Sequence, residues 1–173
     1  MQQIAMFLNG ERGLGVTRAV LDAGHSICCA IVPNILENRN FIAKNLSKFD
    51  IRVDYVENVN EQNFLSALRE RQPMLNIIAG FPTIFRRPLI EIPALGTINL
   101  HAGRLPGYRG GSPLNWQMIN GELAAGISVI RIDEGIDTGP VLAETEIAID
   151  LDDDIADLHR KANSQFPKLV VQV

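Results

Sequence analysis

The sequence predicts one α/β domain, in which a mostly parallel β-sheet is covered by helices on both faces. Short apolar runs alternate with amphipathic segments through most of the chain, which is the pattern of alternating strands and helices. The apolar runs are nearly continuous, as strands buried on both faces require. A length of 173 residues with 46% hydrophobic residues suits one domain with its own core.

The first half of the chain supplies four of the expected strands and the helices between them. The strands are expected at residues 3–8, 26–32, 51–55 and 75–79. The helices are expected at residues 16–23, 37–48 and 60–71. Three glycines within residues 9–15 predict a turn after the first strand, and Gly24 is typical of a helix C-terminus.

The second half departs from this alternation. Its expected elements are a proline-rich loop at 81–93 with at most a short helix, a strand at 97–101, a loop at 102–113, a short helix at 113–120 with Ser112 as its N-cap, antiparallel strands at 126–132 and 140–148, and a helix near 153–166. We therefore expect a Rossmann-like three-layer α/β/α domain, with a mostly parallel sheet and an antiparallel pair near the C-terminal half. In such domains ligands bind beyond the carboxyl ends of the strands.

Composition and charge limit the classes of function. The net charge of −4 argues against a chain that binds nucleic acid mainly by charge. The first residues, MQQIAMFLNG, carry no basic leader, and no apolar run approaches the length of a membrane span. We therefore expect a protein without a secretory signal or membrane span, located in the cytoplasm.

Two adjacent cysteines, Cys28 and Cys29, fall in the strand expected at 26–32. Neighbouring side chains of a strand point to opposite faces, so we expect two packed thiols and no bridge between them. No metal-ligand spacing surrounds them, and no metal site is expected in the protein.

Gly10, Gly13 and Gly15 follow the first expected strand and spell G-x-x-G-x-G. This is not the G-x-G-x-x-G order of dinucleotide-binding turns, which disfavours a nicotinamide-dependent dehydrogenase. Two interpretations stay open. The glycines either allow a sharp turn or form a cradle of backbone amides for an anion at a helix N-terminus. The second interpretation makes Gly10 a candidate substrate-binding residue.

The most informative polar residues are Asn99, His101 and Asp137. Asn99 and His101 are two apart at the end of an expected strand, so their side chains share a face, and Asp137 lies in the turn DEGIDTG. Taken singly, they are compatible with a satisfied polar pair and a turn-capping Asp. Taken together, they supply an amide donor for an oxyanion, an imidazole that donates and passes protons, and a carboxylate that orients it. This set predicts direct transfer of an activated acyl group to an amine.

Two sequence blocks carry a family resemblance: NLHAGRLPGYRGG, with its Asn-x-His followed by Leu-Pro, and IDEGIDTGP, with its Asp-Thr-Gly element. At this spacing the stretch from Thr97 to Glu144 resembles the 10-formyltetrahydrofolate-dependent formyltransferases. The resemblance implies that Asn99, His101 and Asp137 are catalytic, and that 10-formyltetrahydrofolate is the cosubstrate with no metal. It also implies that residues 1–173 are the catalytic domain, without the C-terminal domain of multidomain members.

The resemblance further implies which residues contact the folate. The segment AGFPTIF resembles the family's folate-entrance loop, which places Phe81 and Ile84 against the pterin. Gly135 and Ile136, in the DEGIDTG turn, are expected to contact the same ligand. From the residues alone, Phe81 fits a core position equally well.

The acceptor is less constrained than the donor. The run SPLNWQMINGE resembles the enzymes that act on nucleotide-linked amino sugars, and the arginines near the expected site, including Arg104 and Arg109, suit a diphosphate. We therefore expect a nucleotide-linked amino sugar as acceptor, bound by Gly10, Arg104 and Arg109. Methionyl-tRNA, glycinamide ribonucleotide, hydrolysis of the formyl donor, and a non-catalytic folate- or nucleotide-sugar-binding domain stay open. So does a homodimer.

Overall fold

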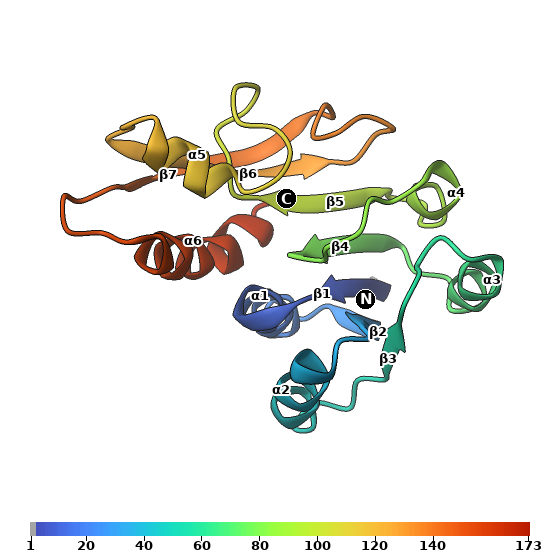
Figure 1. Cartoon of the computed structure of the whole chain (residues 1–173). Coiled ribbons are helices and arrows are strands. Elements are labelled where there is room, and N and C mark those ends of the chain that lie inside the picture. The colour runs from blue at the N-terminus through green and yellow to red at the C-terminus, as the bar shows by residue number, and fades with distance from the viewer. Residues whose placement is uncertain (1–2) are drawn as a thin grey trace.

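The computed structural model describes residues 3–173, apart from the side chains of residues 37 and 38. Its centre is a seven-stranded sheet in the order β3-β2-β1-β4-β5-β6-β7 (Figure 1). The strands are β1 (Gln3–Leu8), β2 (Ser26–Pro33), β3 (Val53–Val56), β4 (Leu75–Ala79), β5 (Thr97–His101), β6 (Ala124–Arg131) and β7 (Val141–Ala148). The first five run parallel, whereas β6 is antiparallel to both β5 and β7. The expected fold class is confirmed. The antiparallel part of the sheet contains the pairing of β5 with β6 in addition to the expected pairing of β6 with β7.

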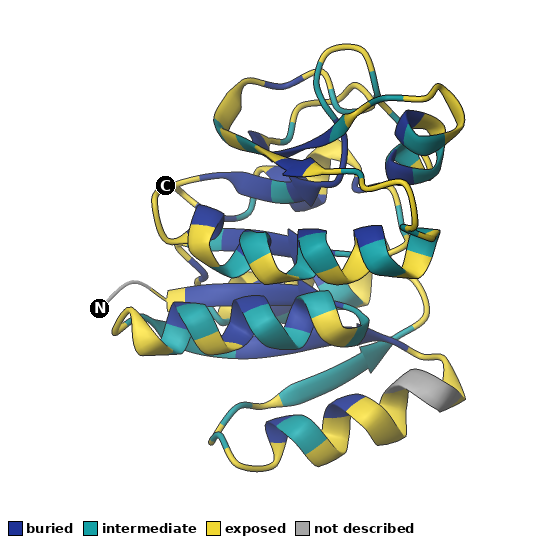
Figure 2. Ribbon diagram, turned by 90° about the vertical axis from the view of Figure 1, so that its left-hand side faces the viewer, coloured by how far each residue is buried: buried dark blue, intermediate teal, exposed yellow. Residues whose placement is uncertain are grey.

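Helices cover both faces of this sheet, which gives three layers. One face carries α1 (Gly10–Asp22), α2 (Leu36–Leu46), α5 (Pro113–Ile119) and α6 (Ile155–Val170), and the other carries α3 (Gln62–Glu70) and α4 (Arg87–Ile90) (Figure 1). Most residues of β1, β2, β4 and β5 are buried between these layers, β3 at the edge of the sheet is half-buried, and the outward faces of the helices are exposed (Figure 2). No helix within residues 3–173 is long and apolar enough to cross a membrane.

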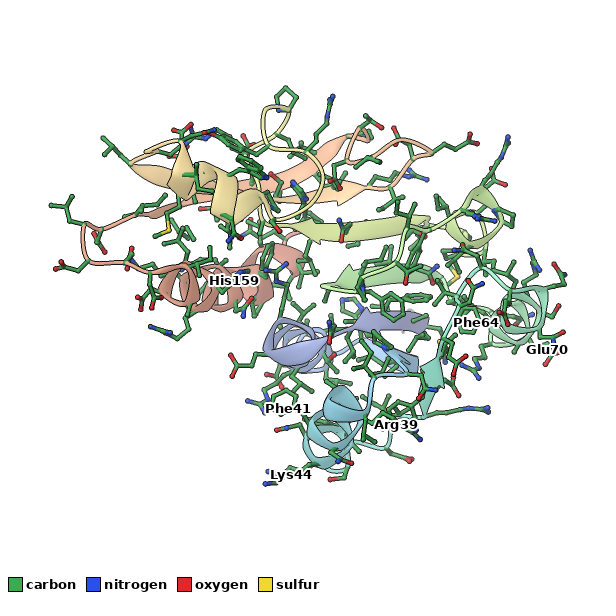
Figure 3. The ribbon with its side chains drawn as sticks, viewed as in Figure 1. Arg39, Phe41, Lys44, Phe64, Glu70 and His159 are labelled. Atoms are coloured by element: carbon green, nitrogen blue, oxygen red, sulfur yellow. The ribbon has the colours of Figure 1, made fainter. Side chains whose placement is uncertain are left out.

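The two faces have separate cores. The larger core lies under α1, α2 and α6, where Val16 and Phe166 are fully buried. The smaller core lies under α3 and α4 and is organised around Phe7, whose ring makes edge-to-face contacts with Phe64 of α3, Phe81 and Phe85. Such contacts stabilise beyond the area that they bury. Phe64 points from α3 toward the sheet (Figure 3).

The glycine turn expected at residues 9–15 is wrong, because α1 begins at Gly10 and includes all three glycines. The reason is close packing rather than turning. A Cβ atom at Gly13 would lie 2.5 Å from Cβ of Leu8, so only glycine lets α1 pass this close to the end of β1. Gly24, which follows α1 with φ of +85°, occupies the left-handed conformation expected for it.

Two helix ends also differ from expectation. Ser112 precedes α5 in the left-handed conformation, with φ of +53°, and its side chain makes no capping hydrogen bond. The last helix continues to Val170 through Pro167 instead of ending near residue 166. Burial of Phe166, Leu169 and Val170 in the larger core explains this continuation, since ending the helix would expose apolar surface.

The packing of α1 makes a prediction that compares two glycines of one helix. Gly13→Ala forces a Cβ atom against Leu8 and should lower the free energy of unfolding by about 1–3 kcal/mol, the usual cost of overpacking. Gly15→Ala is the matched control, because its Cβ atom would lie 3.4 Å from Pro167, an ordinary contact. Alanine there should stabilise the helix by roughly 0.5–1 kcal/mol. Denaturant unfolding measures both, and equal effects would contradict the packing argument.

Candidate active site

The site is built on the polar face of β5. Ile98 and Leu100 turn into the larger core, so the alternate residues Asn99 and His101 face the opposite side of the sheet. The turn between β6 and β7 begins beside the start of β5, where the Ile132 amide donates to the Thr97 carbonyl, and then folds back along β5 toward its end. Between this turn and the sheet lies a cleft, which runs along the carboxyl half of β5 and continues beyond the end of the strand.

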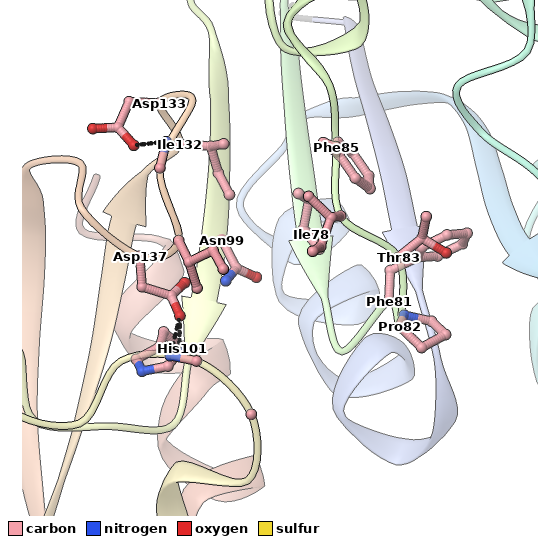
Figure 4. A pocket seen from close by; sticks show the side chains of 15 residues that line it. Ile78, Phe81, Pro82, Thr83, Phe85, Asn99, His101, Ile132, Asp133 and Asp137 are labelled. Carbon is pink, nitrogen blue, oxygen red and sulfur yellow. Dashed lines mark hydrogen bonds and ion pairs between the residues drawn. The ribbon is translucent and has the colours of Figure 1, made fainter.

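The cleft has a volume of about 370 Å³ and two chemically different walls (Figure 4). Asn99, His101 and Asp137 form the polar wall. Apolar side chains face them, and the residues of that wall are Ile78, Phe81, Pro82, Ile84 and Phe85. Such a site suits a ligand with an apolar ring system and one reactive polar end.

His101 is held through both ring nitrogens. Nε2 donates to the Tyr108 carbonyl at 2.6 Å, and Nδ1 lies 3.3 Å from Oδ2 of Asp137. A carbonyl oxygen can only accept, so Nε2 must carry a proton. A hydrogen bond between Nδ1 and Asp137 then needs one further proton, which either group can hold. The pair is thus arranged to share a proton, inside a site where His101 is buried.

Asp137 is placed by its backbone and by two neighbours from the loop after β5. Its φ of +51° lies in the left-handed region, which few non-glycine residues adopt. Oδ2 accepts from the Gly110 amide at 2.9 Å, and the Asp137 carbonyl accepts from Nε of Arg109 at 3.1 Å. The loop after β5 therefore fixes both the carboxylate and the backbone of Asp137.

The rest of the turn is closed by Asp133. Its Oδ1 accepts from the Gly135 amide at 2.9 Å and from the Thr138 hydroxyl at 2.6 Å. These bonds, the Thr138 hydroxyl first, hold the pKa of Asp133 below its ordinary value. Only glycine fits at position 139, because a Cβ atom there would lie 1.8 Å from the Arg131 carbonyl oxygen. The DEGIDTG sequence thus specifies the shape that carries Asp137 to His101.

Three side chains of the cleft are free to contact a ligand: Asn99, Ile84 and Ile136. The side-chain amide of Asn99 has no hydrogen-bond partner within residues 3–173, although it lines the cleft beside His101. Ile84 is 73% exposed on one rim of the cleft, and Ile136 is 59% exposed on the other. Exposed isoleucines on opposite rims provide apolar cover for a bound ring.

A second hollow, of about 330 Å³, reaches Asn99 and His101 from the side of α1 and α6. Arg12 and His159 line it, and His159 projects from α6 (Figure 3). Arg12 donates to Asn163 at 3.1 Å and lies over the Phe166 ring, and it forms no ion pair with any residue of the described chain. Burial lowers the pKa of Arg12 to about 10, and burial followed by the charge of Arg12 lowers the pKa of His159.

The structure gathers most, but not all, of the residues singled out from the sequence. Asn99, His101, Asp137, Phe81, Ile84, Gly135 and Ile136 all line the first cleft. Gly10 lies at a neighbouring hollow with Arg12 and His159. Arg109 contacts the backbone of Asp137 instead of projecting into either space.

Arg104 is not brought to the cleft. Its guanidinium lies 2.8 Å from Glu146 and 3.5 Å from Glu122, and it donates to the Ala124 carbonyl. Its stem packs where a side chain at Gly126 would stand. The expected acceptor contact is replaced by an attachment of the loop after β5 to the strands β6 and β7.

Sequence reasoning missed the residues whose role depends on the fold. Gly103 is one: a Cβ atom there would lie 2.4 Å from the Tyr108 carbonyl oxygen and 2.5 Å from Nε2 of His101. Arg12 and His159 are others, because α6 comes from the far end of the chain. The glycine-rich run at 103–111 was the available signal for a tightly folded loop.

Comparison with known proteins decides the family. Residues 34–173 match the family model described as formyl transferase. The chain belongs to this family. A relative named methionyl-tRNA formyltransferase, from Thermodesulfovibrio yellowstonii, is 38% identical over 116 residues, which cover 67% of this chain and 38% of that protein. Another of that name, from Caldanaerobacter subterraneus subsp. tengcongensis, is 42% identical over 102 residues, covering 59% of this chain and 33% of that protein. This formyl transferase chain thus spans about two fifths or less of the length of these relatives.

Two solved structures of other proteins share the fold. Glycinamide ribonucleotide transformylase 1 from Symbiobacterium toebii superposes with a TM-score of 0.85 at 17% identity, over 99% of this chain and 85% of that one. A formyltetrahydrofolate deformylase from Pseudomonas syringae pv. tomato gives a TM-score of 0.79 at 17% identity, over 99% of this chain and 59% of that one. At these identities the likeness concerns the fold.

The loop after β5 makes the second prediction. Gly103→Ala drives a methyl group between His101 and the Tyr108 carbonyl, so we expect the unfolding free energy to fall by about 1–3 kcal/mol and the His101 ring to lose its fixed position. Gly107→Ala is the control in the same loop, because its Cβ atom would lie 3.8 Å from the nearest atom. Histidine ring resonances in NMR spectra follow His101. Unchanged resonances in Gly103→Ala would refute the proposed contact.

Proposed function

We propose that this formyl transferase moves a formyl group from 10-formyltetrahydrofolate to the amino group of methionine carried by initiator tRNA. The observation that carries the proposal is the 38% identity to methionyl-tRNA formyltransferase over 116 residues that include the Asn99 and His101 block. The walls of the cleft support the folate donor. The apolar wall suits the pterin, and the polar wall suits the formyl group.

The nucleotide-linked amino sugar, placed first in the sequence analysis, has no support from these relatives. The charge argument against tRNA was too broad. The chain spans 38% of the relative from Thermodesulfovibrio yellowstonii, so its charge of −4 does not measure the charge of a whole tRNA-binding enzyme. Arg104, one of the arginines assigned to a diphosphate, is held by glutamates outside the cleft.

The proposed chemistry follows from the contacts of the polar wall. The acceptor nitrogen attacks the formyl carbon, a new C–N bond forms, and the bond from that carbon to N10 of the folate breaks. The Asn99 side-chain amide donates directly to the oxyanion, since no other group of the described residues 3–173 bonds it. His101 is fixed through Nε2 and lies beside Asn99, with Nδ1 turned toward Asp137. Asp137 and His101 move the proton from the attacking amine toward N10.

The two hollows suggest how the substrates share the site. The first cleft, with its apolar wall, holds the folate. The second is lined by Arg12 and His159 and opens on the same Asn99 and His101, so the acceptor amine approaches the formyl group from that side. Lowering of its pKa below the ordinary value near 6.5 keeps His159 neutral at pH 7. Arg12 is then the cationic group of this second hollow.

The third prediction concerns Asn99. Asn99→Ala removes an oxyanion donor and should lower kcat for formyl transfer to charged initiator tRNA by about 10²–10³, with the affinity for 5-formyltetrahydrofolate unchanged. Asn40→Ala, on the exposed surface of α2, is the matched control and should leave kcat unchanged. Rates come from transfer of a labelled formyl group, and affinities come from calorimetry. A variant that keeps wild-type kcat would remove Asn99 from the mechanism.

The same assay tests the acceptor. Charged initiator tRNA, glycinamide ribonucleotide and a nucleotide-linked amino sugar are supplied in turn, together with a reaction that contains only water. We expect formyl-methionyl-tRNA as the main product. Folate binding with efficient formylation of another acceptor would replace the tRNA proposal, and release of formate without an acceptor would replace transfer by hydrolysis.

The fourth prediction concerns the rims of the folate cleft. Ile84→Ser and Ile136→Ser each remove an apolar contact that a bound pterin would bury, so each should weaken binding of 5-formyltetrahydrofolate by roughly tenfold. Ile119→Ser is the control, because Ile119 is 70% exposed on α5 and lies outside the cleft. Calorimetry gives the three dissociation constants. Equal values for all three variants would exclude the rims from the folate site.

A further inference from the structure

A β-bulge brings two thiols together at the other end of the sheet. Along the pairing of β1 with β2, Ile4 aligns with Ile27 and Ala5 aligns with Cys29, so Cys28 is an extra residue on β2. A bulge breaks the alternation of side chains between the two faces. Sγ of Cys28 therefore lies 3.8 Å from Sγ of Cys29, and the expectation that the two thiols face apart is wrong.

The two thiols differ in access and in charge. Cys28 is half-buried and donates through Sγ to the Ile4 carbonyl, whereas Cys29 is fully buried. The hydrogen bond with Cys29 lowers the pKa of Cys28 to about 7, and the same bond, with burial, raises the pKa of Cys29. Arg71 lies beside the Cys29 thiol and also binds Asp54. The half-buried thiol, Cys28, is thus the more nucleophilic one. The guanidinium of Arg71 is placed to stabilise a negative charge on Cys29.

We propose that Cys28 and Cys29 form a chelating dithiol site for a soft, thiophilic centre, of which a trivalent arsenical is the simplest probe. The separation of the sulfurs carries this inference. Trivalent arsenic is pyramidal, and with arsenic–sulfur bonds of about 2.3 Å and an angle of about 100° between them it spans a gap of roughly 3.5 Å. The thiols already stand 3.8 Å apart, so side-chain rotations that bring the sulfurs closer by a few tenths of an ångström are enough to seat such a centre.

Other occupants fit this geometry less well. A disulfide needs its sulfurs about 2.05 Å apart, and its Cα atoms usually lie at least about 4.4 Å apart, farther than two residues joined by one trans peptide bond. A structural zinc ion needs about four ligands. Within residues 3–173 no group of three or more His, Cys, Asp or Glu side chains is placed to hold a metal ion. A soft centre that is satisfied by two sulfurs remains.

The reaction with the probe balances without an oxidant. Phenylarsine oxide has an arsenic–oxygen bond that is replaced by two arsenic–sulfur bonds, and the two thiol protons leave with the oxygen as water. Cys28, the accessible thiol, attacks first. Cys29 then closes the chelate, and Arg71 favours loss of its proton.

This site is separate from the folate cleft. Cys29 aligns through Ala5 and Asn76 with Thr97, the first residue of β5, whereas the cleft lies at the carboxyl half of that strand. The proposal therefore does not depend on the proposed formyl transfer.

The test uses phenylarsine oxide on the folded chain, which has only these two cysteines. We expect one arsenical per chain by intact-mass spectrometry, kept against excess glutathione and released by a dithiol. Cys28→Ser and Cys29→Ala should each lose this resistance by about a hundredfold or more, the size of a chelate's effective-concentration gain. Native mass spectrometry distinguishes a chelate within one chain from a link between two chains.

A thermal melt separates a site of the fold from the reactivity of two adjacent cysteines in an unfolded chain. A preformed site binds the native state preferentially, so the arsenical should raise the Tm of the wild type and leave that of the double variant unchanged. A lowered Tm, a resistant adduct in either single variant, or an adduct that forms only in urea would overturn the proposal.

Discussion

The contact between His101 and Asp137 joins the end of β5 to the turn between β6 and β7. His101 ends β5, and Asp137 belongs to a turn that starts beside the other end of that strand. A third segment, the loop after β5, holds the pair: the Tyr108 carbonyl accepts from His101, and the Gly110 amide donates to Asp137. Because each residue is held by the others, the buried imidazole and the partly buried carboxylate are satisfied, and a polar site can exist against the core of the sheet.

Much of this site could be predicted from the sequence because its signals are local. Asn99 and His101 stand two apart in an apolar strand, and the spacing alone puts them on one face. The DEGIDTG turn carries its own instructions in Asp133, Gly135 and the following glycine. Family resemblance then connected the two blocks. Neither signal specifies the path of the turn, and so the cleft along the face of β5 could be found only in the structure.

The errors share a physical cause, since each concerns a contact between elements rather than a property of one element. Gly13 was interpreted as a turn residue, although its glycine is required by Leu8 of the neighbouring strand. Arg104 was assigned to a phosphate, although its guanidinium is bound by Glu122 and Glu146 away from the cleft. The bulge at Cys28 depends on the register between two strands. Register is a tertiary property that the alternation of residues in one strand does not reveal.

The turn between β6 and β7 folds back on its own sheet, and this has a consequence for the order in which the site forms. β6 must first pair with β5, because the turn starts from that pairing. Only then can Asp137 reach Gly110, whose amide has the carboxylate as its acceptor. We therefore expect the site to be one of the last regions to close in folding and among the first to open in local unfolding. Exchange of the Gly110 amide hydrogen with solvent reports that opening directly, in the absence of any substrate.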